Sequence, residues 1–143
     1  AARALEIERL SAAERRVAVG DGNPLDVETS KTRAVELEAT TRGMAAKLDI
    51  RQQFLKRQID APMADLRVLE AEAEQRRQTL QPRMELAQRA SKDVARRVQI
   101  GTAQQVELLE AQLRLAQLAA DLAKADVDLA MIRRQIEQRR TGK

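Results

Sequence analysis

Residues 95–136 read ARRVQIGTAQQVELLEAQLRLAQLAADLAKADVDLAMIRRQI, which is the end of one predicted helix, a break at Gly101 and a longer helix. After the break, apolar residues recur at alternating spacings of three and four residues. They are Leu108, Ala111, Leu115, Leu118, Leu122, Ala125, Leu129, Ile132 and Ile136, named here the first row. This spacing is typical of a helix that packs lengthwise against other helices.

A second row of apolar residues repeats the same spacing on this helix. Its members are Val106, Leu109, Leu113, Ala116, Ala120, Ala123, Val127 and Ala130. Two apolar rows on one helix predict a wide buried face. We therefore expect this helix to contact at least two neighbouring helices in a bundle.

The same pattern occurs earlier in the chain, at an offset of 81 residues. Arg15, Arg16, Val17 and Gly20 then align with Arg96, Arg97, Val98 and Gly101, and Arg33 and Leu37 align with Arg114 and Leu118. The first copy of the first row is less regular and reads Val27, Ser30, Ala34, Leu37, Thr41, Met44, Leu48 and Leu55. A repeat of this length indicates one structural unit used twice, here about residues 1–60 and 62–140 of a single domain over 1–143.

The composition predicts an all-α protein made of antiparallel helical hairpins in a long-helix, coiled-coil-like bundle. The chain has 143 residues, one Phe, no Tyr or Trp, and only five Gly and three Pro. Ala, Leu, Glu, Gln and Arg dominate, and these residues favour helices. No alternating, strand-like stretch is present.

Gly and Pro place the expected helices at residues 3–18, 24–59, 62–99 and 103–139. Gly20 is suited to end the first helix. Asn23, or alternatively Asp21, is suited to cap the second, which begins at Pro24.

Residues 60–62 read Asp-Ala-Pro and favour a turn over a kinked continuous helix. Pro82 is expected to kink the third helix, whose middle is polar on nearly every side. Thr102 with Gln105 matches a capping box for the last helix.

The net charge is +4, yet acidic and basic residues alternate along the predicted helices. Five acid-first pairs have helical i,i+4 spacing: Glu38–Arg42, Glu72–Arg76, Glu85–Arg89, Asp93–Arg97 and Glu110–Arg114. Most of the charge therefore indicates a solvated helix surface. The densest basic group, Arg133, Arg134, Arg139 and Arg140, falls in the last turns of a helix, where cations are favoured.

Residue types limit the chemistry that this chain can perform. Without His or Cys, the common zinc sites and nucleophile–base arrangements cannot be assembled. Glu70 and Glu74 share a helical face, but a solvated acidic face explains them better than a metal site. We expect no enzyme activity, cofactor, metal or small-molecule substrate. No stretch of about 18 apolar residues predicts a membrane span, and no signal peptide is recognised.

One phrase in each copy resembles a known family. The second copy reads Val-Gln-Ile-Gly-Thr at 98–102 and Val-Glu-Leu-Leu-Glu-Ala-Gln at 106–112. The first copy keeps Val-Gly at 19–20 and Leu-Asp-Val at 25–27. These phrases resemble the hairpin repeats of TolC-like outer-membrane efflux factors, and the resemblance covers most of the chain. It implies two helix–turn–helix tips that carry basic residues and dock a partner protein.

The resemblance places a docking site at the two tips. The candidate residues are Arg15, Arg16, Gly20, Asp21, Arg96, Arg97, Gly101 and Thr102. The charge of a helix C-terminus is a competing explanation for both arginine pairs. The chain also departs from the family, because residues 60–62 and more helix stand where membrane β-strands are expected. A soluble helical domain that reuses the hairpin is the resulting expectation.

The sequence favours a structural or interaction module in the periplasm or cell envelope of a bacterium. One alternative is an extracytoplasmic stalk of a membrane-anchored signalling protein, which would reach the membrane only through flanking segments. An Arg-mediated nucleic-acid binder is the other alternative, disfavoured by the alternating charges.

We also expect two copies to associate, because the first helix is half as long as the others. This would leave a groove for a second copy, lined by Leu118, Leu122, Leu129, Ile132, Ile136, Leu48 and Leu55.

Overall fold

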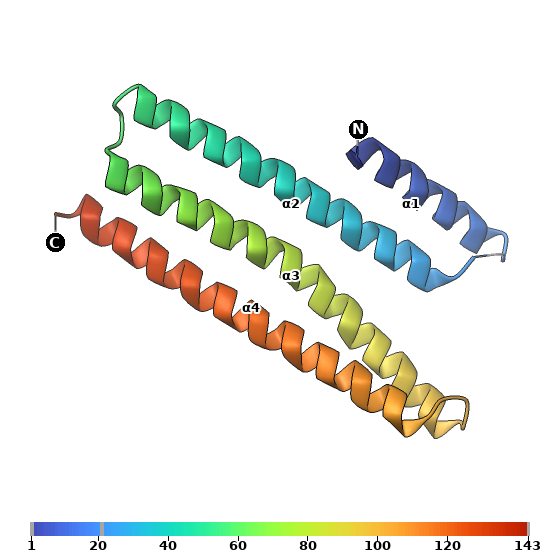
Figure 1. The fold of residues 1–143 in the computed structure, drawn as a ribbon. Coiled ribbons are helices and arrows are strands. Elements are labelled where there is room, and N and C mark those ends of the chain that lie inside the picture. The colour runs from blue at the N-terminus through green and yellow to red at the C-terminus, as the bar shows by residue number, and fades with distance from the viewer. Residues whose placement is uncertain (1, 21, 143) are drawn as a thin grey trace.

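The computed structural model describes residues 2–20 and 22–142. Four helices make up this part of the chain: α1 (Ala2–Ala18), α2 (Pro24–Leu55), α3 (Ala61–Gln99) and α4 (Gln105–Arg140). Consecutive helices run antiparallel and form hairpins (Figure 1). The prediction of an all-α fold is confirmed, and the described residues contain no strand.

The helices lie side by side in an open layer in the order α1, α2, α3, α4 (Figure 1). Each helix contacts its neighbours along the chain, whereas no Cα atom of α2 lies within 8 Å of one in α4, and α1 likewise stays away from α3 and α4. Helices α2 and α3 are therefore the inner helices of the layer, and α1 and α4 form its edges.

The ends of the helices follow the 81-residue offset seen in the sequence. Helix α1 ends at Ala18 and α3 at Gln99, while α2 begins at Pro24 and α4 at Gln105. The glycines after α1 and α3 have positive φ, +81° at Gly20 and +80° at Gly101. Glycine adopts this conformation without a Cβ penalty, so both expected terminators act in the same way.

The predicted turn at residues 60–62 is confirmed, but α2 ends four residues earlier than expected. Arg57 adopts a left-handed φ of 58°, and the Gln58 N–H donates to the Gln53 carbonyl at 2.9 Å. This closure ends the helix without a glycine. Asp60 then caps α3, since its carboxylate accepts from the Met63 N–H at 2.9 Å.

The N-termini of α2 and α4 differ in how well the sequence predicted their caps. Asn23 caps α2 by accepting from the Leu25 N–H at 3.0 Å, with Pro24 in the first position, as expected. The capping box of α4 was misplaced, because Gln104 and Glu107 form it and the Gln104 N–H donates to Glu107 at 2.8 Å. Thr102 lies before the cap and bonds back to α3.

The first row of α4 is buried or half-buried along its whole length against α3. Leu122, Leu129 and Ile136 are 9%, 3% and 4% exposed. The second row is exposed throughout, so the prediction that it is also buried was wrong. Its residues point away from α3, and no other helix of the layer reaches that side of α4.

In α2 the copied row is buried only where α1 covers it. Val27 is buried, whereas Met44, Leu48 and Leu55 are 67%, 59% and 70% exposed. Helix α1 begins beside the middle of α2 (Figure 1), so the far half of the row has no neighbour. The expected groove at Leu118–Ile136 is absent, because those side chains pack on α3; only its Leu48 and Leu55 side is open.

The polar middle of α3 binds both neighbouring helices through ion pairs. Toward α2, Glu72 pairs with Lys47 at 2.9 Å and Arg83 pairs with Glu36. Toward α4, Arg77 pairs with Asp126 at 2.7 Å. Of the five i,i+4 pairs expected within helices, only Asp93–Arg97 forms among the described residues. Helix α3 also changes direction near its middle, where Pro82 lies inside it (Figure 1).

Candidate functional site at the hairpin tips

The first tip joins α1 to α2. The Gly20 N–H donates to the Val17 carbonyl at 3.1 Å, which closes α1. The Arg15 guanidinium lies along α1 and donates to the Ser11 carbonyl and hydroxyl at 3.2 and 3.3 Å. Arg16 is exposed. Asp21, also expected at this tip, falls outside the described residues.

The second tip joins α3 to α4 and closes in the same way. The Gly101 N–H donates to the Val98 carbonyl at 3.1 Å, and the Thr102 N–H donates to the Arg97 carbonyl at 2.8 Å. The Thr102 hydroxyl donates to that carbonyl too, at 3.2 Å. Arg97 pairs with Asp93 at 3.2 Å, and both Arg96 and Arg97 are exposed.

The antiparallel order of the helices brings both tips to the same end of the layer (Figure 1). Helices α1 and α3 are not in contact, so the two arginine pairs occupy separate tips and form no single basic cluster. At each tip one arginine bonds to its own helix and the other forms no ion pair among the described residues, and all four arginines are exposed. The predicted docking residues therefore lie on two separate, similarly built tips at one end of the layer.

Gly22 is a tip residue that the sequence analysis did not single out. A Cβ added to Gly22 would lie 2.6 Å from the Val17 backbone nitrogen and 2.8 Å from the Arg16 carbonyl carbon. Such distances are too short for a real contact. The backbone at Gly22 therefore packs so closely on the end of α1 that a side chain has no room there. The second tip has Ala103 at the equivalent position. In the sequence, the need for glycine at position 22 is indicated only by this Gly-to-Ala difference between the two copies.

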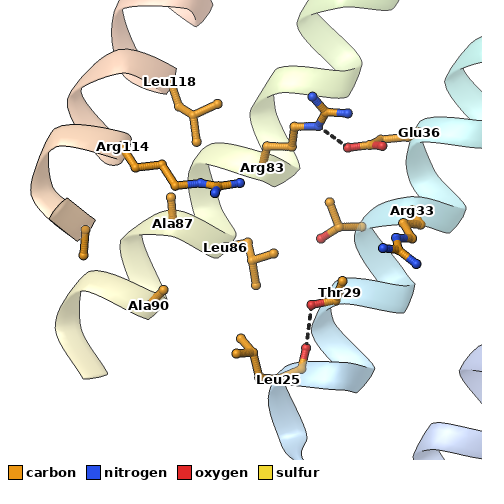
Figure 2. A pocket seen from close by; sticks show the side chains of 12 residues that line it. Leu25, Thr29, Arg33, Glu36, Arg83, Leu86, Ala87, Ala90, Arg114 and Leu118 are labelled. Carbon is orange, nitrogen blue, oxygen red and sulfur yellow. Dashed lines mark hydrogen bonds and ion pairs between the residues drawn. The ribbon is translucent and has the colours of Figure 1, made fainter. Parts of the chain in front are cut away.

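A cavity of about 480 Å³ opens near the tips, over α3 and between α2 and α4 (Figure 2). Its apolar lining comes from all three helices: Leu25, Leu86, Ala87, Ala90, Ala111 and Leu118. Its rim carries Arg33 from α2 and Arg114 from α4, which align in the repeat. Among the described residues, neither arginine forms an ion pair.

A third arginine of this cavity is neutralised. Arg83 pairs with Glu36 across the α2–α3 contact, and this hydrogen bond raises the pKa of the guanidinium, which is charged at every ordinary pH (Figure 2). Glu36 therefore offsets Arg83, and the rim keeps the positive charge of Arg33 and Arg114. The cavity combines an apolar surface with two cations.

The basic group at the end of α4 is largely paired. Arg133 donates to Glu70 at 3.3 Å and to Glu74 at 3.1 Å, and Arg139 donates to Asp60 at 2.9 Å. Glu70 and Glu74 thus hold an arginine, and no group of three or more potential metal ligands occurs in the described residues. The pairing removes much of the free positive charge that a nucleic acid would need.

The one buried charged residue in the described ranges, Glu6, was not anticipated. Glu6 belongs to α1 and is 5% exposed, and one of its carboxylate oxygens accepts from Arg9 at 3.4 Å. Its other oxygen has no hydrogen-bond partner among those residues. Glu6 occupies a position of α1 where an apolar residue is the usual choice.

Comparison of the chain with protein-family models, curated proteins and solved structures gives no match. A search of the helices in the described ranges finds none that is both long and apolar enough to cross a membrane.

Proposed function

We propose that this chain is a non-enzymatic interaction module that docks a partner protein through its two glycine tips and the cavity beside them. The observation that carries the proposal is the shared closure of the tips. Two hairpins end in the same hydrogen-bonded turn, at the same repeat position and at the same end of the layer. A repeated exposed geometry of this kind supports recognition of a partner at two equivalent points.

The cavity indicates the chemistry of that partner. Apolar side chains from α2, α3 and α4 line it, and Arg33 and Arg114 stand at its rim. A protein segment with apolar residues and a carboxylate matches this surface, since guanidinium groups bind carboxylates with two hydrogen bonds. We expect the segment to lie over α3, where it contacts both hairpins.

The resemblance of residues 98–112 to TolC-like efflux factors supports a place in an export complex of the bacterial cell envelope, in the periplasm. The alternative of an extracytoplasmic stalk shares the same helical hairpins. The two hypotheses differ in what binds the tips. In an export complex it is a second protein component, whereas in a signalling stalk it is a neighbouring domain of the same protein.

Site-specific photocross-linking in the native cell tests the docking proposal. A cross-linking residue at Thr102 or Val19 is expected to trap one discrete protein, which then binds the purified chain. The same residue at Gln88, exposed on α3, is the control and is expected to trap none. Arg33→Glu with Arg114→Glu is expected to weaken the purified complex at least tenfold, because the carboxylate of the partner then meets two negative charges in place of two guanidinium groups.

Equal trapping at Gln88 and at the tips would contradict docking at the tips. A titration with duplex DNA separates the nucleic-acid alternative, because binding to phosphates weakens steeply as salt increases. Tight, salt-sensitive DNA binding without a trapped protein would replace the proposal with that alternative.

A further inference from the structure

The second row of α4 is a continuous apolar strip on the free edge of the layer. Its large members Val106, Leu109, Leu113 and Val127 are 58%, 56%, 61% and 57% exposed. The alanines between them are exposed as well. The strip runs from the first turn of α4 to Ala130, and the next position of its spacing is Arg134. An apolar strip of this length on a helix surface marks an interaction site.

The repeat shows how the same row is used in the first copy. The equivalents of Ala120 and Val127 are Ala39 and Ala46 of α2, and Ala39 is 1% exposed. Ala46 is half-buried, and both lie on the side of α2 toward α3, where Gly43 contacts Gln75. At Ala39 and Ala46, this face of the first copy therefore packs against an antiparallel helix. In the part of the chain that the structure describes, no helix packs against this face of α4.

The spacing of the second row is the same when read in either direction, which makes it self-complementary. Two copies of α4 placed antiparallel, with residue 118 at the centre, bring every member opposite another member. The facing pairs are Val106–Ala130, Leu109–Val127, Leu113–Ala123 and Ala116–Ala120. Val106 and Leu113 then face alanines, Leu109 faces Val127, and the central alanines allow the helices to approach closely.

Charges beside the strip complement each other in the same arrangement. Glu110 lies eight residues before the centre and Lys124 six residues after it, on the same flank of the helix. Both are exposed, and neither forms an ion pair among the described residues. Antiparallel pairing therefore places Glu110 of each copy beside Lys124 of the other, twice by symmetry.

The other edge of the layer is a poorer partner for this strip. Helix α1 is 17 residues long, and the side turned away from α2 carries Glu8 and Arg15. The exposed Met44, Leu48 and Leu55 of α2 span only part of the length of the strip. Another copy of α4 is the one surface of the described chain that matches the strip in length, spacing and charge.

We propose that two copies of this chain associate through their α4 helices, antiparallel and about a two-fold axis at residue 118. The second row forms the interface, and the first row stays packed on α3. The tips of the two copies then point in opposite directions. The proposal is independent of what docks at the tips.

Cysteine cross-linking of the full chain tests the register, because the chain contains no native cysteine. A mixture of the Val106→Cys and Ala130→Cys variants is expected to form a disulfide under mild oxidation. Neither variant alone is expected to do so, because like positions lie roughly 36 Å apart at 1.5 Å per residue. Self-cross-linking of each variant alone would indicate parallel pairing and overturn the proposal. A disulfide between Leu113→Cys and Leu48→Cys variants would indicate head-to-tail contact and also overturn it.

Sedimentation gives the second readout. Leu113→Lys is expected to raise the dissociation constant of the dimer about 100-fold, because symmetry places each substitution in the interface twice. Leu48→Lys on α2 has nearly the same exposure and is the matched control, with no effect expected. Glu110→Lys or Lys124→Glu weakens the dimer severalfold, and the double variant restores it. A strictly monomeric parent, or a dimer indifferent to Leu113→Lys, would overturn the proposal.

Discussion

Gly43 of α2 lies directly against Gln75 of α3, so that a Cβ on Gly43 would come within 2.2 Å of the Gln75 Oε1 atom. The sequence alone predicts that Gly43→Ala is neutral or stabilising, because Ala is the better helix former. The contact adds an opposing term, since the Gln75 carboxamide must move to admit the methyl group.

A double-mutant cycle measures this opposing term. In a Gln75→Ala background, Gly43→Ala is expected to stabilise the protein by about 0.5–1 kcal/mol. In the parent background the gain is expected to be smaller by the free energy needed to displace Gln75. Chemical denaturation of the four proteins gives the coupling. Identical effects of Gly43→Ala in both backgrounds would show that Gln75 moves freely.

The two rows of α4 predict a large loss of stability in one row and little change in the other for the same substitution. Leu122→Ala or Leu129→Ala is expected to lower the free energy of unfolding by about 2–5 kcal/mol, because each side chain is buried against α3. Leu113→Ala in the second row is the matched control and is expected to change it little when measured at concentrations where the chain is monomeric. Equal losses at Leu113 and Leu122 would mean that the assignment of the buried face is wrong.

The left-handed residues that end α3 and α2 predict opposite changes in stability: replacing the glycine at one end destabilises the protein, and introducing a glycine at the other stabilises it. Gly101→Ala is expected to destabilise the protein by about 1–2 kcal/mol through backbone strain alone, since no atom lies within 4 Å of the added Cβ. Gly101→Val is expected to cost more than Gly43→Ala. Arg57→Gly is expected to stabilise by about 0.5–1 kcal/mol, because Arg57 already adopts a left-handed conformation. Thermal melts of the variants decide both signs.

Gly22 predicts a local effect at the first tip. Gly22→Ala is expected to loosen the end of α1, because the new Cβ clashes with backbone atoms of Val17 and Arg16. Hydrogen exchange is expected to become faster in residues 2–18, with little change in α3 and α4. Ala103→Gly, at the same position of the second tip, is the matched control. Unchanged protection of α1 in the Gly22→Ala variant would contradict the close approach.

The turn between α2 and α3 predicts a dependence on acid. The Arg139 guanidinium, and then the Met63 N–H, hold the pKa of the Asp60 carboxyl below its ordinary 3.8. A carboxyl with a lowered pKa in the folded state stabilises the fold above its unfolded pKa, and this contribution is lost as the pH falls through the folded pKa. Denaturation midpoints between about pH 6 and pH 2 are expected to fall less for Asp60→Asn than for the parent. Parallel pH profiles would show that the carboxyl is not engaged in solution.

Local features of the helices were readable from the sequence because they depend on near neighbours in the chain. Gly20 and Gly101 end helices, Asn23 and Asp60 begin them, and the first row of α4 gives the face that is buried. Backbone strain, hydrogen bonds over two to five residues and the 3.6-residue period determine these features. The two candidate tips follow from them directly.

Only the tertiary structure decided which helix packs against each helix face. The sequence contains two apolar rows in α4, and the layer covers one of them because, among the described helices, only α3 lies beside α4. Acidic residues expected to pair within a helix pair across helices instead, as Glu72 does with Lys47. Gly43 lies against Gln75 of α3, a contact that its helical period does not predict. Each of these outcomes depends on side chains that are distant in the chain and adjacent in space, and helical periodicity carries no information about such neighbours.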